Sequence, residues 1–214
     1  MNTIVINDRK KTNHSNGTSS RKGLVFIPDI SGFTELVRST DLITGQIITY
    51  ELLSAIIRHN TLDMEIAEIE GDAIFFFKWR SIPTTEELYE QFEVMKTAFD
   101  SKIRELENKY HLDLYLHLKA IAHYGEMTQF SIEGFNKLYG EVVIEAHRLL
   151  KNNVPARSYL LVTDELMAVS GQPVLNSFFH TERSSKLCEI YGGLRNLCFT
   201  YILFEYLRPT PHFL

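Results

Sequence analysis

Two aspartates stand beside apolar stretches in a way that could bring their carboxylates together. Asp29 follows the apolar run at residues 24–27, and Asp72 lies at the bend between two further runs, residues 62–68 and 73–77. A hairpin packed beside the first strand would place Asp29 and Asp72 side by side. Two neighbouring carboxylates repel each other unless a divalent cation lies between them, and hard oxygen ligands suit Mg²⁺ or Mn²⁺. The spacing therefore predicts a metal site.

The chain is expected to turn sharply after the first strand. Ser31 and Gly32 would let the backbone turn, and Pro28 has no amide hydrogen for a ladder bond at the strand's end. A helix is expected from Phe33, and free amides at a helix start favour a bound anion. The segment is interpreted as a phosphate-binding turn. An ordinary strand-to-helix turn, with the two aspartates as cap and turn residues, would have the same sequence.

The sequences FIPDISGFT at residues 26–34 and EGD at residues 70–72 resemble the class III nucleotidyl cyclases, the adenylyl and guanylyl cyclases. In that family the first strand ends in Phe-x-Asp-Ile-x-Gly-Phe-Thr, and the hairpin carries Gly-Asp. The resemblance extends from about Leu24 to about Leu203, and is greatest to a bacterial group of single-domain cyclase-like proteins of unassigned function.

This resemblance implies roles for both motifs. Asp29 and Asp72 would bind two divalent ions, with the carbonyl of Ile30 as a further ligand. One ion would lower the pKa of the nucleotide's 3′-hydroxyl, and the other would neutralise the triphosphate. The β- and γ-phosphates would be bound by the amides of Gly32, Phe33 and Thr34.

The sequence YGEVVIEAHRL at residues 139–149 resembles the family's Gly-x-x-Val-Asn-x-Ala-x-Arg-Leu helix. In active cyclases the Asn orients the ribose, and the Arg stabilises charge on the α-phosphate. Arg148 is retained, but Ile144 stands at the Asn position and cannot hydrogen-bond the ribose oxygen. This loss could cost on the order of 10²-fold in rate. Arg148 could equally pair with Glu145 on the helix surface.

Two further positions of the family's pattern are not expected to take part in catalysis here. The family lysine near the C-terminus is replaced by Gly192, with Arg195 nearby as a candidate substitute. His123 lies in the family's His-x-Gly element and is predicted to be a hydrogen-bonded core residue, since no second His or Cys stands at ligand spacing.

The family selects its base with two residues, which correspond here to Glu68 and Lys137. A carboxylate accepts from the N1–H and exocyclic amine of guanine, and Lys137 could donate to O6, so GTP is slightly favoured. The two side chains could equally pair with each other and close the pocket, or bind the edge of a pyrimidine.

Because the family assembles its site across a two-fold axis, the resemblance also implies a homodimer with two sites.

Composition narrows the choice of partners and location. The chain has 214 residues and a formal net charge of −5, which argues against nucleic acid or an anionic membrane as the main partner. It has neither an apolar run of membrane-spanning length nor a signal-peptide core, so a cytoplasmic location is expected.

Cys188 and Cys198 are predicted to be buried, reduced thiols rather than a disulfide or metal ligands.

The chain divides into a predicted mobile tail, residues 1–23, and one cyclase-like domain, residues 24–214. Helices are expected at residues 33–38, 43–60, 84–109, 141–152 and 163–169. Strands are expected at residues 24–27, 62–68, 73–77, 112–122, 126–130, 159–162, 177–181, 187–191 and 197–204. This order resembles an α+β fold with a ferredoxin-like βαββαβ core and elaborations.

The combined interpretation is a class III-like nucleotidyl cyclase that forms a 3′,5′-cyclic nucleotide and pyrophosphate. The intact Asp29, Asp72 and Arg148 favour this enzyme. Ile144 and Gly192 favour the alternative, a catalytically silent domain that binds a nucleotide or dimerises as a signalling module. A related phosphoryl-transfer reaction on the same metal platform is a third hypothesis.

Overall fold

Apolar runs separated by turn residues build an alternating series of strands and helices. The computed structural model describes residues 20–170, 184–190 and 195–204. Along these residues the elements are β1 (Arg21–Ser31), α1 (Phe33–Ser39), α2 (Leu42–Arg58), β2 (Glu65–Glu70), β3 (Ala73–Lys78), α3 (Thr85–Tyr110), β4 (His117–Ile132), β5 (Phe135–Tyr139), α4 (Glu141–Leu149), β6 (Tyr159–Thr163), α5 (Asp164–Val169), β7 (Ser184–Ile190) and β8 (Asn196–Leu203).

The strands form one sheet with the order β2-β3-β1-β4-β6-β8-β7, and β5 pairs with β4 outside this path. The β2-β3-β1-β4 part is antiparallel throughout, with α1 and α2 connecting β1 to β2 and α3 connecting β3 to β4. This is the strand order of a βαββαβ core. After α4, β6 joins β4 in parallel. The predicted α+β fold with a ferredoxin-like core and elaborations is confirmed.

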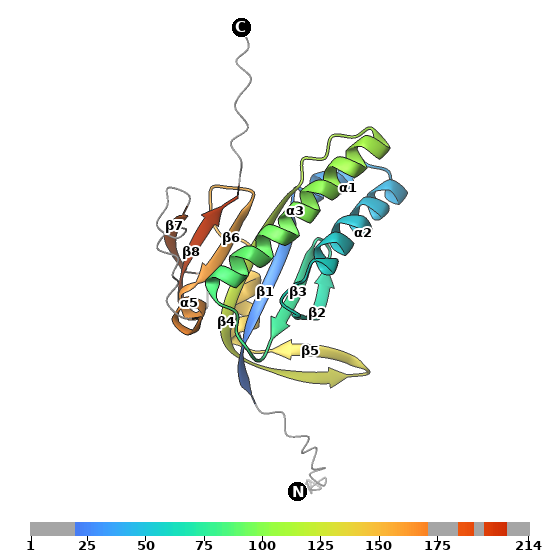
Figure 1. Cartoon of the computed structure of the whole chain (residues 1–214). Helices are drawn as coiled ribbons and strands as arrows, with labels where there is room; N and C mark the ends of the chain where they lie inside the picture. Colours follow the sequence, from blue (N-terminus) through green and yellow to red (C-terminus); the bar gives the residue numbers. More distant parts are fainter. Residues whose placement is uncertain (1–19, 171–183, 191–194, 205–214) are drawn as a thin grey trace, which may run out of the picture.

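The sheet is covered on both faces. Figure 1 shows α2 and α3 lying across one face, and their apolar stripes pack against Leu24 and Phe26 of β1. Val25 and Ile27 point the other way, into a second cluster that includes Val142 of α4. Because side chains alternate along a strand, Asp29 continues the face that α4 covers. None of the described helices combines the length and apolar character that a membrane crossing needs.

Several predicted boundaries are wrong near β4 and β1. β1 begins at Arg21, inside the predicted tail, whereas residues 1–19 lie outside the described residues. β4 begins only at His117 and runs through Gly125 without a break. Gly125 allows this course because a Cβ there would lie 2.9 Å from the Cβ of Val142, so the glycine lets α4 approach the strand. The predicted strand at residues 177–181 lies outside the described residues.

A hairpin extends β4 into residues 131–139, where no strand was predicted. Glu133 and Gly134 both have positive φ, 50° and 85°, the backbone of a tight two-residue hairpin turn. The turn pairs Ile132 with Phe135 and creates β5. The turn residues are Glu-Gly, which is a weaker hairpin signal than Asn-Gly, so the sequence did not predict this hairpin.

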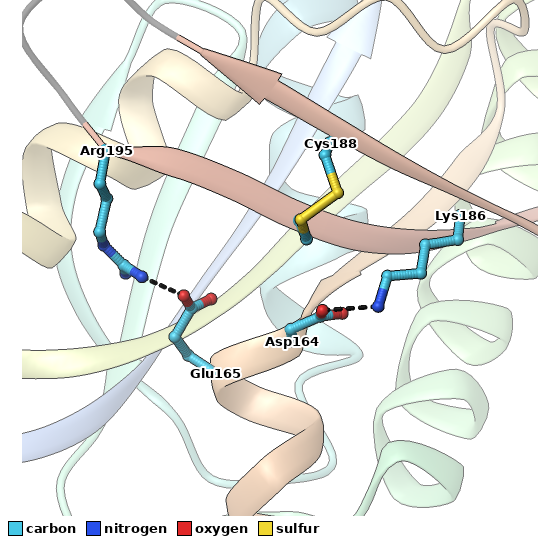
Figure 2. The surroundings of a disulfide bond; sticks show 6 residues. Asp164, Glu165, Lys186, Cys188 and Arg195 are labelled. Atoms are coloured by element: carbon cyan, nitrogen blue, oxygen red, sulfur yellow. Dashed lines mark hydrogen bonds and ion pairs between the residues drawn. A yellow bond between two sulfur atoms is a disulfide. The ribbon is translucent and has the colours of Figure 1, made fainter.

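The prediction of reduced cysteines is also wrong. Cys188 of β7 and Cys198 of β8 are partners in the antiparallel register and form a disulfide. Cys188 is exposed, so the bond lies at the outer edge of the sheet and not in a core. Figure 2 shows that Lys186 of the same hairpin reaches Asp164 at the start of α5, at 2.6 Å. The disulfide therefore ties β7 to β8, and the ion pair ties β7 to α5.

The disulfide predicts a thiol count that a reagent can measure. Protein denatured without reductant is expected to release no free thiol, and protein denatured after reduction is expected to show the two thiols of Cys188 and Cys198. The measurement is a colorimetric thiol assay on material purified under non-reducing conditions. Two thiols before reduction would show that the bond does not form.

Because the closed loop is short, reduction is expected to cost about 2–3 kcal/mol of unfolding free energy.

Candidate active site

The structure brings Asp29 and Asp72 together, as predicted. Asp29 lies opposite Ala73 in the β1–β3 register, and the amide of Ile30 donates to the carbonyl of Asp72 at 3.2 Å. Burial raises the pKa of both carboxyls. The charge of Asp29 raises the pKa of Asp72 further, because the two side chains lie close enough to interact directly. The hairpin therefore forces two like-charged groups into one place.

Lys119 stands beside this acidic pair and was not identified from the sequence. It is the cross-strand partner of Asp29 on β4, and its Nζ lies 3.4 Å from Asp29 Oδ2. The same Nζ donates to the carbonyl of Leu150, at the end of α4, at 3.0 Å. Lys119 lowers the pKa of Asp29 and so works against the larger effect of burial.

The donor chemistry of the pair fits a hard divalent cation. Two carboxylates converge and leave coordination positions that water or phosphate oxygens could fill. The described residues contain no group of three or more His, Cys, Asp or Glu able to hold a metal. A cation here would thus depend on Asp29, Asp72 and a backbone oxygen such as the carbonyl of Ile30, together with ligands from outside the chain.

The glycine turn after β1 has the geometry that the sequence predicts. Gly32 has φ 94°, and a Cβ on it would lie 2.5 Å from the carbonyl oxygen of Tyr115, so no other residue fits without a shift. The amides of Glu35 and Leu36 bond back to the carbonyl of Gly32. The amides of Phe33 and Thr34 precede these first helical bonds. Phosphate binding by this turn stays a prediction.

Arg148 and Ile144 lie one turn apart on the outer side of α4. The Ile144 side chain is 53% exposed, and Arg148 is exposed as well. The Arg148 side chain has no hydrogen bond or ion pair with the described part of the chain. The alternative pairing of Arg148 with Glu145 is wrong, because Glu145 lies on the buried stripe of α4 with Val142 and Leu149.

Glu145 instead forms a buried polar network. His123, which is fully buried, contacts the Glu145 carboxylate through Nε2 at 2.8 Å and Thr163 Oγ1 through Nδ1 at 2.8 Å. Arg195 donates to both oxygens of Glu145, at 2.7 and 3.0 Å, and also pairs with Glu165, as Figure 2 shows. The prediction of a hydrogen-bonded core histidine is confirmed.

The Arg195 guanidinium therefore already pairs with two carboxylates, those of Glu145 and Glu165, and would have to break these contacts to bind a phosphate. Gly192, the residue at the family's lysine position, lies outside the described residues. The candidate replacement of that lysine by Arg195 thus has no geometric support within the described residues.

Glu68 and Lys137 meet in a direct ion pair that joins β2 to β5. Hydrogen bonding to Glu68 and the charge of Glu68 raise the pKa of Lys137. The alternative in which the two base-selecting residues pair with each other is therefore the arrangement that the structure shows. The pair is partly exposed, so both charges stay near the surface.

The buried network predicts a pH-dependent contribution to stability. Burial alone would raise the pKa of Glu145, but hydrogen bonds from His123 and Arg195 outweigh burial and hold the pKa below 4.5. A carboxyl with a lowered folded-state pKa stabilises the fold above its unfolded pKa, and loses this effect as pH falls through the folded pKa. Glu145→Gln is expected to cost about 2 kcal/mol or more near pH 7, measured by urea unfolding.

The difference between wild type and Glu145→Gln should shrink as the pH falls below 4.5. Glu141→Gln is the matched control, since Glu141 is exposed in the first turn of the same helix, and should cost less than about 1 kcal/mol. An equal cost for Glu145→Gln at every pH would contradict the network.

Comparison with solved structures identifies the fold. The guanylyl cyclase Cya2 superposes with a TM-score of 0.67 and 14% identity, covering 91% of this chain and 98% of that one. A class III adenylyl cyclase-like ATP-binding protein from Pseudomonas aeruginosa gives 0.60 and 15%, covering 77% of this chain and 37% of that one. At these identities the likeness shows the fold alone, which is that of the class III nucleotidyl cyclase catalytic domains.

Sequence comparison gives two further findings. An uncharacterized protein of Mycobacterium tuberculosis (strain ATCC 25618 / H37Rv), Rv2561/Rv2562, is 32% identical over 109 residues, which is 47% of this chain and 50% of that protein. The match thus spans about half the length of this curated relative. Residues 49–159 match the family described as "Protein of unknown function (DUF2652)". Because this match covers more than half of the chain, the protein belongs to the DUF2652 family.

Proposed function

We propose that the protein binds a nucleoside triphosphate with Mg²⁺ or Mn²⁺ and converts it to a 3′,5′-cyclic nucleotide and pyrophosphate. The observation that carries this proposal is the convergence of the Asp29 and Asp72 carboxyls beside the Gly32 turn, on a cyclase-type fold. Two half-buried like charges side by side cost stability in the absence of a ligand, so their proximity favours a function that needs them together.

The residues around this pair suit the reaction. Cyclisation joins the 3′-oxygen to the α-phosphorus, breaks the bond to the β-phosphate and releases pyrophosphate, while the hydroxyl proton passes to water. A cation held by Asp29 and Asp72 would favour loss of that proton and neutralise phosphate charge. The amides after Gly32 would bind the outer phosphates. Arg148, whose side chain has no partner among the described residues, would stabilise charge on the α-phosphate.

The base would be guanine. Glu68 can accept from the N1–H and exocyclic amine, and Lys137 can donate to O6. Without nucleotide these two side chains satisfy each other, so a guanine that enters would replace one ion pair with hydrogen bonds to both residues. An adenine in the same pose has neither an N1–H nor a C2 amine to offer Glu68, and its N6 amine would face Lys137 in place of the acceptor O6.

The site would form between two copies of the chain. The β4–β5 hairpin extends away from the rest of the sheet in Figure 1. The cross-strand register gathers exposed apolar side chains on one of its faces. Cross-strand pairing puts Lys137 on that face, so the base-binding pair would lie inside the interface. The apolar residues of this face, here called the hairpin face, are Phe130, Ile132, Phe135 and Tyr139. Exposed apolar residues gathered in this way favour a protein partner, and a second copy would bring Arg148 to the acidic pair.

A second candidate is a domain that binds the nucleotide without turning it over. Ile144 supports this candidate, because the exposed apolar side chain offers the ribose no hydrogen bond. One of the structural neighbours is an adenylyl cyclase-like ATP-binding protein. In both candidates the metal pair and the triphosphate site are the same, and only product formation differs.

Product analysis separates the two candidates. Purified protein incubated with each ribonucleoside triphosphate and Mn²⁺ is expected to form cyclic product, most from GTP, detected by chromatography. Asp29→Asn and Asp72→Asn should each lower the rate by at least about 10²-fold, because the cation loses a ligand. Asp113→Asn, at an exposed aspartate in the loop before β4, is the control and should leave the rate unchanged. Triphosphate binding without product would select the silent domain, and no binding would refute both.

The hairpin face predicts a specific dimer defect. Phe135→Asp places a charge where we expect apolar contact and should raise the dimer dissociation constant at least about 100-fold, measured by sedimentation velocity. Leu42→Asp is the matched control, since Leu42 is 84% exposed on α2, away from the hairpin face. A variant that stays dimeric at every concentration tested would place the interface elsewhere.

A further inference from the structure

Lys119 lies next to the acidic pair and has no part in the reaction proposed above. Its side chain is 16% exposed and that of Asp29 is 14% exposed, so both charges are largely withdrawn from water. The separation of 3.4 Å between Nζ and Oδ2 is an ion-pair distance. At low exposure such a pair interacts far more strongly than a surface pair does.

The position of Lys119 is fixed by the sheet. Asp29 and Lys119 are direct partners in the continuous β1–β4 register, and both side chains lie on the face covered by α4. On this face, Ile121 and His123 follow Lys119 along β4 and are buried. The ammonium is thus held at the same carboxylate that a divalent cation would need.

We propose that Lys119 is a resident counter-ion of Asp29: its ammonium neutralises this carboxylate when no divalent cation is bound and withdraws when one binds. The inference rests on the proposed metal site and adds a residue that sets its affinity. A cation entering between Asp29 and Asp72 meets a positive charge already in place, so Lys119 weakens divalent binding and keeps the empty pair stable.

The second contact of Lys119 gives the displaced ammonium a partner. Nζ donates to the carbonyl of Leu150 at 3.0 Å, where α4 ends. The carbonyl end of a helix favours a positive charge. When Lys119 moves away from Asp29 it keeps this hydrogen bond, so the ammonium is not left buried without a partner.

A purely structural role for Lys119, as a pin that holds the end of α4 through Leu150, makes a different prediction. In that case the hydrogen bond matters and the charge does not. Lys119→Gln keeps a donor and removes the charge, whereas Lys119→Arg keeps the charge, so the two variants separate the two roles.

The test measures Mn²⁺ binding to the full chain without nucleotide, by the electron paramagnetic resonance signal of free Mn²⁺. Lys119→Gln is expected to bind Mn²⁺ at least about tenfold more tightly than wild type, and Lys119→Arg to bind as wild type does. Lys119→Met is the second charge-free variant, used if Lys119→Gln fails to fold in circular dichroism. Lys96→Gln is the matched control, since it removes another lysine paired with an aspartate, Asp100 on α3, and should leave binding unchanged.

Each outcome decides the inference. A gain in Lys119→Gln that disappears when Asp72→Asn is added supports it, because the gain then belongs to the acidic pair. Measurable binding with equal affinity in wild type and Lys119→Gln overturns the inference and leaves the metal site standing. No binding in wild type or in either charge-free variant overturns the metal site as well. The readout needs no turnover, so it applies equally to a catalytically silent domain.

Discussion

The structure depends on the pairing that holds two like charges at adjoining strand ends. The β1–β3 register sets Asp29 opposite Ala73, and the bond from the Ile30 amide to the Asp72 carbonyl closes the arrangement. Attraction between the carboxylates does not cause this proximity. Buried apolar side chains of both strands set the register, since a shift of one residue would turn every apolar side chain to the wrong face. Apolar packing of β1 and β3 thus offsets the repulsion between the two carboxylates, and the ammonium of Lys119 reduces that repulsion further.

Local signals explain why much of this could be predicted from the sequence. The stripe of apolar residues in α3 and its Thr84 capping box are short-range features, and the helix begins where the cap predicts. The Gly32 turn follows from a residue that tolerates positive φ. The meeting of Asp29 and Asp72 required only a hairpin beside the first strand, because two motifs with fixed spacing specify it.

What could not be predicted comes from contacts across strands that are distant in sequence. In the sequence Lys119 is one polar residue in an alternating strand, and only the β1–β4 register shows that it faces Asp29. The disulfide likewise depends on the pairing of β7 with β8. Glu145 is different, since it shares the i, i+3, i+4 and i+7 stripe with Val142, Ala146 and Leu149, and this spacing alone indicates a buried carboxylate in need of partners.

Pro28 gives the end of β1 a mechanical property of its own. The register with β3 is recorded at Phe26 and again at Asp29, with a gap between them, because the proline has no amide hydrogen to donate, whereas pairing with β4 continues without a break. The strand end that carries Asp29 is therefore anchored firmly on one side and loosely on the other. On the β3 side, the placement of Asp29 relative to Asp72 therefore rests on the contacts beyond the proline, which are the pairing of Asp29 with Ala73 and the bond from the Ile30 amide to the Asp72 carbonyl.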